Sequence, residues 1–299
     1  MSLEGTITTL LTNGFHIHKV ERVSFGNTII SAYKFDRLGA QVRYSLLFSD
    51  DSQANSSIAT LITSSRLYKS TPVFINDNVQ SELCHNFTTE AFFNLFGGIV
   101  NTGLILVSNL PEILDQLGHN SLPSGLSGEP DDLLEIYSSE CLQFSMFSPT
   151  RHYGKDRLFQ KLPDGLVLGN KLPILFDSKS YSKGFEFQAD DIDRFASYIE
   201  DFDLRYSAYL GKIFSFLVIS GHFNDSSKSI SNRSDQLYKK SGCRLSCLTS
   251  KEMGEIVELL KNSPNKRNSI DWKNIFSELI ISKKHIEKEL ARINQDQIH

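Results

Sequence analysis

A short apolar run that ends in charged residues constrains this chain more than any other feature. Leu172–Phe176 lies between Gly169-Asn170 and Gly184, and its composition predicts a buried strand. Asp177-Ser178-Lys179 closes the run, and side chains alternate along a strand, so Asp177 and Lys179 project to the same face. A carboxylate at the end of a buried strand is costly unless something compensates it. The fold must therefore bring compensating groups to this strand end.

A second carboxylate stands thirteen residues before the first, in the turn Pro163-Asp164. If Asp164 reaches Asp177, repulsion between the two charges raises the cost further. Two acids at one place suit a divalent cation, and Lys179 beside them suits a water molecule or the developing charge of a phosphate. The pattern then predicts metal-assisted phosphodiester chemistry. The alternative is an ordinary strand-end ion pair between Asp177 and Lys179.

Further motifs surround these residues in a fixed order. Pro163-Asp164-Gly165 comes first, Asp177-Ser178-Lys179 second with Tyr181-Ser182-Lys183-Gly184-Phe185 after it, and Ser220-Gly221-His222-Phe223 last. With this order and spacing, residues 132–262 resemble the PD-(D/E)xK nucleases, and among them the FokI-type cleavage domain of type IIS restriction enzymes. The resemblance implies an α/β fold, with a restriction-endonuclease-like core in which helices flank a mixed sheet. We expect a further α/β domain N-terminal to it.

The resemblance also implies roles for individual residues. Asp164 and Asp177 would bind the metal ion together with the main-chain carbonyl of Ser178, and Lys179 would orient or activate the attacking water. Mg²⁺ is the expected ion, with Mn²⁺ as a substitute, because Mg²⁺ prefers oxygen ligands and keeps several waters. The core helix of this family often adds a glutamate, and Glu135 and Glu140 are both candidates. The alternative for both is a solvated helix face.

Charge is distributed unevenly along the chain. Residues 1–149 hold 7 Lys or Arg and 15 Asp or Glu, whereas residues 150–299 hold 24 and 20. Phosphate contacts need cations, so DNA contacts are predicted around the proposed site. The candidates are Arg151, Lys155, Arg157, Lys161, Lys183 and His222, although His222 could equally cap a strand end, the role we favour for it. Any DNA contacts of the N-terminal half would come from Lys19, Arg22, Lys34, Arg37, Arg43, Arg66 and Lys69.

Composition and periodicity predict the division of the chain. We expect an N-terminal α/β domain over residues 1–117, a linker rich in Gly, Ser and Pro over 118–131, and a nuclease domain over 132–299. The tail, Trp272–Ile293, is predicted to be one amphipathic helix. The N-terminal half has a similar order of elements without the carboxylates and lysine. It is either an independent domain or a decayed nuclease-like copy, serving in DNA recognition or partner contact.

The resemblance leaves the pairing of two copies open. FokI-type domains pair through the helix after the Asp-x-Lys strand, with an Asp and an Arg four residues apart. Counted without gaps, those positions are Asp193 and Ser197, so the pair is not preserved. One active site cuts one strand, and cleavage of both strands therefore requires a homodimer or a partner subunit.

These observations predict a Mg²⁺-dependent restriction endonuclease, of type II and IIS-like, that acts on double-stranded DNA. The alternative is a cleavage or nicking subunit that takes its sequence specificity from a larger partner. A third interpretation, an inactive binding protein, is disfavoured by the intact Asp164, Asp177 and Lys179. The sequence has no apolar run of membrane length and no leader, and its four cysteines form no CxxC pattern. We expect a cytoplasmic protein with reduced thiols and no membrane partner.

Overall fold

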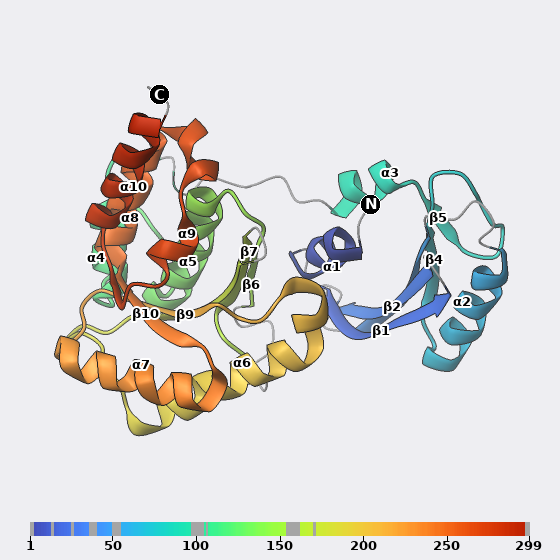
Figure 1. Cartoon of the computed structure of the whole chain (residues 1–299), viewed down its shortest axis with the longest axis horizontal. Coiled ribbons are helices and arrows are strands. Elements are labelled where there is room, and N and C mark those ends of the chain that lie inside the picture. The colour runs from blue at the N-terminus through green and yellow to red at the C-terminus, as the bar shows by residue number, and fades with distance from the viewer. Residues whose placement is uncertain are drawn as a thin grey trace. The chain divides into compact units, whose positions relative to one another are not determined.

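Two β-sheets organise the chain, each in its own unit (Figure 1). The computed structural model describes residues 3–12, 15–24, 27–35, 41–49, 55–96, 105, 107–153, 162–169 and 172–296. The first unit comprises residues 1–99 and the second residues 100–299. Both sheets mix parallel and antiparallel pairs and both carry helices, so the predicted mixed α/β class is confirmed.

The first unit is a five-stranded sheet with strand order β1-β2-β3-β4-β5. Its elements are α1 (Leu3–Thr12), β1 (His16–Ser24), β2 (Asn27–Phe35), β3 (Gln41–Ser49), α2 (Asn55–Tyr68), β4 (Thr71–Ile75), β5 (His85–Phe87) and α3 (Thr89–Phe96). The first three strands pair antiparallel, and β3, β4 and β5 pair parallel. Helix α2 buries Ile58 and Leu61 against Ile29, Leu47 and Phe74 of the sheet.

The second unit is a six-stranded sheet with strand order β11-β10-β9-β8-β7-β6. Its first elements are α4 (Leu110–Gly118), α5 (Pro130–Met146), β6 (Thr150–His152), β7 (Gly165–Gly169), β8 (Leu172–Lys179), α6 (Ala189–Leu210) and β9 (Ser215–Ser220). Then follow α7 (Ser227–Ser241), β10 (Arg244–Thr249), α8 (Ser250–Lys261), a 3-10 helix (Pro264–Ser269), α9 (Trp272–Ile275), β11 (Ile280–Ile281) and α10 (Lys283–Asp296). Strands β6, β7 and β8 pair antiparallel, and β8 to β11 pair parallel.

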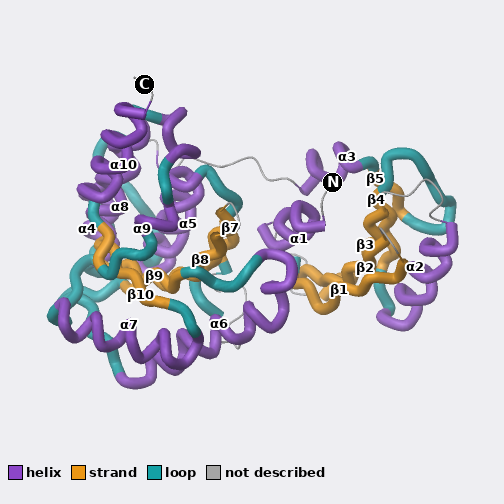
Figure 2. Tube along the Cα trace, viewed as in Figure 1, coloured by secondary structure: helices purple, strands orange, loops and turns teal. Residues whose placement is uncertain are grey.

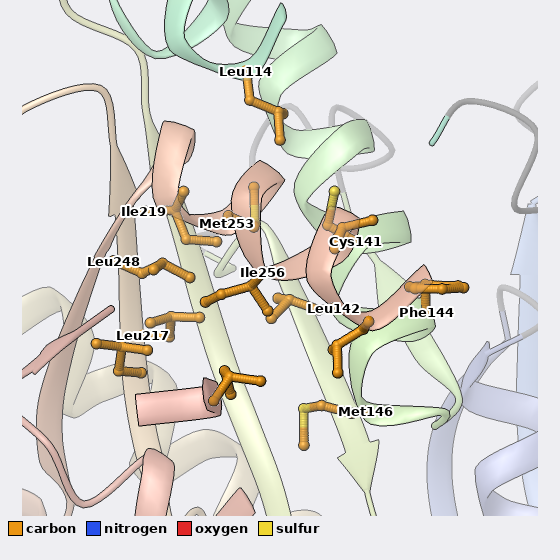
Figure 3. Packing of buried hydrophobic residues seen from close by; sticks show 14 of the residues in the cluster. Leu114, Cys141, Leu142, Phe144, Met146, Leu217, Ile219, Leu248, Met253 and Ile256 are labelled. Atoms are coloured by element: carbon orange, nitrogen blue, oxygen red, sulfur yellow. The ribbon is translucent and has the colours of Figure 1, made fainter. Parts of the chain in front are cut away.

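Helices cover both faces of the second sheet. Figure 2 shows α6 and α7 together on one face and α4, α5, α8 and α10 on the other. The second group encloses the main core, where Leu142 of α5 and Ile256 of α8 pack against Leu217 and Ile219 of β9 (Figure 3). Strand β8 is thus buried on both faces, which accounts for its continuous apolar run.

The two units repeat one order of elements. In each, a helix precedes three antiparallel strands, a second helix follows, and the next strand pairs parallel with the third. At the strand edge where the second unit carries Asp164 and Asp177, the first unit pairs Asn27 with Ser49, and the Asn76 side chain donates to the Ser49 carbonyl at 2.9 Å. This common order is what the hypothesis of a nuclease-like copy requires. The three side chains at that edge are neutral.

The predicted boundary at residues 118–131 needs correction, because the units divide between residues 99 and 100. Helix α4 was assigned to the N-terminal domain, but it buries Leu110, Ile113, Leu114 and Leu117 in the core of the second unit, against α5 and α8. Gly254 of α8 approaches α4 so closely that a Cβ there would lie 2.6 Å from Pro111 Cα. The segment rich in Gly, Ser and Pro is therefore a turn between two helices of one unit.

The C-terminal tail also differs from the prediction of one continuous helix. Ile280 and Ile281 form β11, which pairs parallel with Cys247 and Leu248 of β10, because β-branched residues suit the free edge of the sheet. Helix α7 was not predicted. Its N-cap is Ser226, whose side chain accepts a hydrogen bond from Ser229 N–H, and its C-cap is Gly242 with φ 73°. None of the helices in the described ranges combines the length and the apolar character that crossing a bilayer requires.

Candidate active site

Two neighbouring strands bring the predicted acids together. Asp164 comes directly before β7, Asp177 and Lys179 lie at the end of β8, and Gly165 pairs antiparallel with Phe176. A Cβ atom on Gly165 would overlap the buried Phe176 ring and lie 2.7 Å from the Arg151 carbonyl oxygen. The glycine of the Pro-Asp-Gly motif is thus required for close packing, and this packing sets Asp164 beside the end of β8.

Asp164 is held by the backbone of β8. Its Oδ2 accepts a hydrogen bond from Ser178 N–H at 2.5 Å, and its carbonyl accepts one from Tyr153 N–H at 2.8 Å. Burial raises the pKa of Asp164 well above its usual value, and the nearby carboxylates of Asp177 and Glu135 raise it further. Lys179 and the Ser178 N–H lower that pKa but do not offset the increase. The site is therefore short of positive charge.

Asp177 and Lys179 form a close ion pair. Asp177 is 3% exposed, and its Oδ2 lies 2.5 Å from Lys179 Nζ. Burial alone would lower the pKa of Lys179, but Asp177 and Asp164 outweigh it and the pKa is raised. Lys179 is thus an ammonium group at neutral pH. Arg194 of α6 adds a second cation 4.0 Å from Asp177 Oδ2, and it is anchored to Asp191 at 2.5 Å.

The structure distinguishes the two candidate glutamates on α5. Glu135 lies close enough to Asp164 to raise the pKa of that carboxyl, and its Oε2 is 3.2 Å from His152 Nε2 on β6. Glu140 faces the other side of the helix, where it raises the pKa of Tyr137 and of Cys141, in each case in addition to the effect of burial. Glu135 is therefore the acid that α5 brings to the site.

Other residues near the site were missed by sequence reasoning. His152 holds Glu135, Arg194 faces Asp177, and burial together with Asp177 raises the pKa of Tyr198 to about 12. Ser138, one turn after Glu135, has its Oγ 3.2 Å from Ser178 Oγ. Arg194 and Tyr198 are four residues apart and share a face of α6. That spacing was readable in the sequence, but it becomes informative only when this face is known to meet β8.

Helix α4 holds the loop that follows Lys179. Ser180 Oγ donates to the Leu117 carbonyl at 2.6 Å, and Tyr181 N–H donates to the Gly118 carbonyl at 3.1 Å. Gly118 and Gly221 approach so closely that a Cβ on Gly221 would lie 2.6 Å from the Gly118 carbonyl carbon. The last turn of α4 therefore supports the end of β8 and the Ser-Gly-His-Phe motif together.

The predicted DNA-contacting residues divide into three groups. Lys183 and His222 are exposed on adjoining loops, and the main-chain carbonyl of His222 accepts the Phe185 N–H at 2.8 Å, a contact that does not involve the imidazole. Arg151 is only 7% exposed and lies over the Tyr153 ring, so the surface contact predicted for it does not fit this arrangement. Lys155, Arg157 and Lys161 lie outside the described residues.

The predicted pairing positions lie on one groove between α6 and α7. Asp193 and Ser197 both line it, and Asp193 is paired with Lys240 of α7 at 2.8 Å. Helix α6 also contains an Asp and an Arg four residues apart in its first turns, Asp190 and Arg194. This pair lies three residues before the positions that the count without gaps gives.

The site fits a hard divalent cation. Asp164 and Asp177 offer carboxylate oxygens at one strand edge, and Ser178, whose N–H donates to Asp164 Oδ2, is the residue expected to add its carbonyl. Among the described residues there is no group of three or more His, Cys, Asp or Glu side chains that could hold a metal ion by themselves. Two carboxylates, a carbonyl and water are the set that Mg²⁺ commonly accepts. The raised pKa of Asp164 reports the excess negative charge that such an ion would neutralise.

Comparison with known proteins gives a family for this part of the chain. The model of the family described as FokI, cleavage domain, matches residues 116–281, which is more than half of the chain. Similar solved structures include the restriction endonuclease FokI bound to DNA, at 18% identity and a TM-score of 0.41, and the restriction endonuclease FokI, at 18% and 0.39. Each covers 62% of this chain, and the matched parts span only 36% and 35% of those chains. No curated protein matches this chain in sequence.

Proposed function

The chain belongs to the FokI cleavage-domain family, and we propose that it is a metal-dependent restriction-type endonuclease that hydrolyses phosphodiester bonds of double-stranded DNA. One observation carries the proposal. Asp164, Asp177 and Lys179 converge at one strand edge, where burial and the neighbouring carboxylates raise the pKa of Asp164. A structural ion pair needs only Asp177 and Lys179, and it does not account for a second acid brought to the same place.

Each residue has a defined part in this mechanism. Asp164, Asp177 and the Ser178 carbonyl would hold Mg²⁺, and Glu135, which lies near Asp164, would add negative charge to the site. When bound, the ion supplies Lewis acidity and lowers the pKa of a bound water. Lys179 remains protonated because its pKa is raised, so it acts as a hydrogen-bond donor that orients the attacking water and offsets charge on the phosphate. Arg194 places a second positive charge 4.0 Å from Asp177 Oδ2, beside that carboxylate.

The first unit would supply DNA recognition or contact with a partner. One active site cuts one strand, and double-strand cleavage then requires a homodimer or a partner subunit.

The alternative function, a cleavage or nicking subunit with borrowed specificity, is favoured by the low cation content of residues 1–149, which hold 7 Lys or Arg against 15 Asp or Glu. Exposed Lys183, four residues after Lys179, would contact the substrate backbone.

Incubation of the purified full-length protein with supercoiled plasmid and Mg²⁺ tests both forms of the proposal. Linear product with defined ends supports a restriction endonuclease, and nicked circles alone support the nicking-subunit alternative. Asp177→Ala and Lys179→Ala should abolish either product, whereas Asp235→Asn, which changes an exposed acid of α7, should not. Cutting by folded Asp177→Ala protein, or cutting that survives thorough chelation, contradicts the assignment.

A further inference from the structure

The first unit contains a pocket of about 230 Å³. Its lining does not include Asn27 or Ser49, which mark the strand edge that corresponds in position to the candidate active site of the second unit. It lies on the sheet beside the C-terminal end of α2, and Ser31 and Tyr33 of β2 and Arg43 of β3 line it. Tyr33 and Arg43 are register partners on adjacent strands. Ligand pockets for larger molecules span roughly 300–1,000 Å³, so this volume suits a single planar ring system.

A buried hydroxyl lies in the wall of the pocket. Ser31 is 5% exposed, and within the described part of the chain its Oγ has no hydrogen-bond partner. The neighbouring hydroxyls are satisfied, because Ser45 Oγ and Ser70 Oγ lie 2.7 Å apart. A buried polar group without a partner lowers stability, and such groups in native proteins commonly meet water or a ligand. Ser31 is therefore the hydrogen-bonding group of this pocket.

Aromatic rings form the walls. His18, Tyr33 and Tyr68 line the pocket together with Tyr44, whose own ring packs edge to face on Phe15 with ring centroids 5.5 Å apart. His18 and Tyr68 meet edge to face with ring centroids 6.2 Å apart, and Tyr33 lies 5.0 Å from the ring of His16. These contacts hold the rings in place, and positioned aromatic faces stack on nucleobases without regard to their sequence.

Cationic side chains line the pocket and an adjoining groove. The Arg43 guanidinium is held by Gln41 Oε1 at 3.1 and 3.2 Å and by the Tyr68 carbonyl at 3.5 Å. Arg43 also lines an adjoining open groove together with Arg66 and Lys69. These are three of the seven cations of residues 1–149. Their concentration beside an aromatic pocket, in an acidic half of the chain, favours an anionic ligand with a ring.

We propose that this pocket binds one nucleobase, hydrogen-bonded to Ser31, with its phosphate on Arg43, Arg66 and Lys69. A base turned out of a DNA strand and a free nucleotide share this chemistry. The site lies within the first unit and involves no bond cleavage, so it goes beyond the proposed endonuclease activity and does not depend on it.

Binding by the full-length protein in EDTA tests the proposal without cleavage. The probe is a single-stranded oligonucleotide that contains 2-aminopurine, whose fluorescence changes when the base enters an aromatic pocket. Ser31→Ala should weaken binding about fivefold to tenfold, with no fall in the thermal midpoint, because the Oγ has no protein partner to lose. Tyr68→Ala should weaken binding roughly five- to hundredfold through lost stacking. Arg66→Ala should lower the salt slope by about 0.7 of a unit, the value for one lost phosphate contact to a single strand.

Lys228→Ala is the matched control, since it removes an exposed cation of α7 in the second unit, outside the pocket and the groove. It should bind as the unaltered protein does. Displacement of the probe by nucleoside monophosphates identifies a free nucleotide as the ligand, and retention of the probe identifies a base of DNA; either result supports the site. A probe that does not bind, or that binds Ser31→Ala and Tyr68→Ala as tightly as Lys228→Ala, overturns it. If the unaltered protein does not cut plasmid but Ser31→Ala and Tyr68→Ala still weaken probe binding, the proposed endonuclease activity is refuted and the proposed binding site is supported.

Discussion

Replacing Asp164 with Asn should stabilise the metal-free second unit, and the gain should grow with pH. The pKa of Asp164 is raised above the value near 3.8 that applies in the unfolded chain. Between these two values the folded protein holds a proton that the unfolded chain has released. The free energy of unfolding therefore falls by about 1.4 kcal/mol for each pH unit across this interval, and it levels off above the folded pKa. Asparagine keeps the shape and removes the charge.

Urea unfolding in EDTA between pH 5 and pH 8 measures this effect. The only tryptophan of the chain, Trp272, packs against the core of the second unit, so its fluorescence reports the unfolding of that unit alone. The difference between Asp164→Asn and the unaltered protein should widen as pH rises and then become constant. Asp235→Asn, which alters an exposed acid of α7, should show no such trend.

Added Mg²⁺ completes the experiment. At one hundred times its dissociation constant, the ion should stabilise the unaltered protein by about 2.7 kcal/mol. It should stabilise Asp164→Asn much less, because one of the two carboxylate ligands is gone. A difference between the two proteins that is independent of pH would refute the raised pKa, and equal stabilisation by Mg²⁺ would refute Asp164 as a ligand.

Three further predictions concern the same site. Gly165→Ala should lower the free energy of unfolding by about 1–3 kcal/mol, because the new methyl overlaps Phe176, and Phe176→Leu in the same chain should recover part of the loss; additive thermal shifts would contradict this. Glu135→Gln and His152→Ala should each weaken Mg²⁺ binding about tenfold to a hundredfold in calorimetric titration, whereas Glu140→Gln should not, and equal effects of the two glutamates would reverse their assignment. Ca²⁺ in place of Mg²⁺ should permit DNA binding without turnover, so plasmid cutting in Ca²⁺ alone would count against a Mg²⁺ site.

The strand carrying Asp177 and Lys179 was predictable because its signals are local. A buried apolar run closed by charges, and a Pro-Asp-Gly turn before it, are both written within a few residues. The choice between Glu135 and Glu140 was not local, because both lie on one helix and only the packing of α5 against β7 and β8 decides which one faces Asp164. The same holds for Arg194, which matters only once α6 is placed over β8.

The division of the chain failed for a related reason. Gly, Ser and Pro between residues 118 and 130 indicate a break in regular structure, but composition does not distinguish a linker from a turn. That distinction lies in where Leu110, Ile113, Leu114 and Leu117 are buried, which is a property of the folded core. The order of helices and strands in the first unit could be predicted from the sequence. That Asn27 and Ser49 occupy the strand edge corresponding to Asp164 and Asp177 could not, because it depends on the pairing register of β2 and β3.

The anchoring of the loop after Lys179 by α4 bears on how the second unit, with its proposed nuclease site, can be transferred to other proteins. A fusion protein that joined a foreign DNA-binding domain at residue 132 would delete the carbonyl acceptors of Ser180 and Tyr181 and uncover the surface that Gly118 fills beside Gly221, and a junction at residue 118 would delete the acceptor of Ser180. The transferred segment would keep Asp164, Asp177 and Lys179 but would lose the last turn of α4, which holds the loop after Lys179 in place. A junction before Leu110 keeps that turn, so the smallest transferable cutting module is longer at its N-terminal end than its motifs suggest.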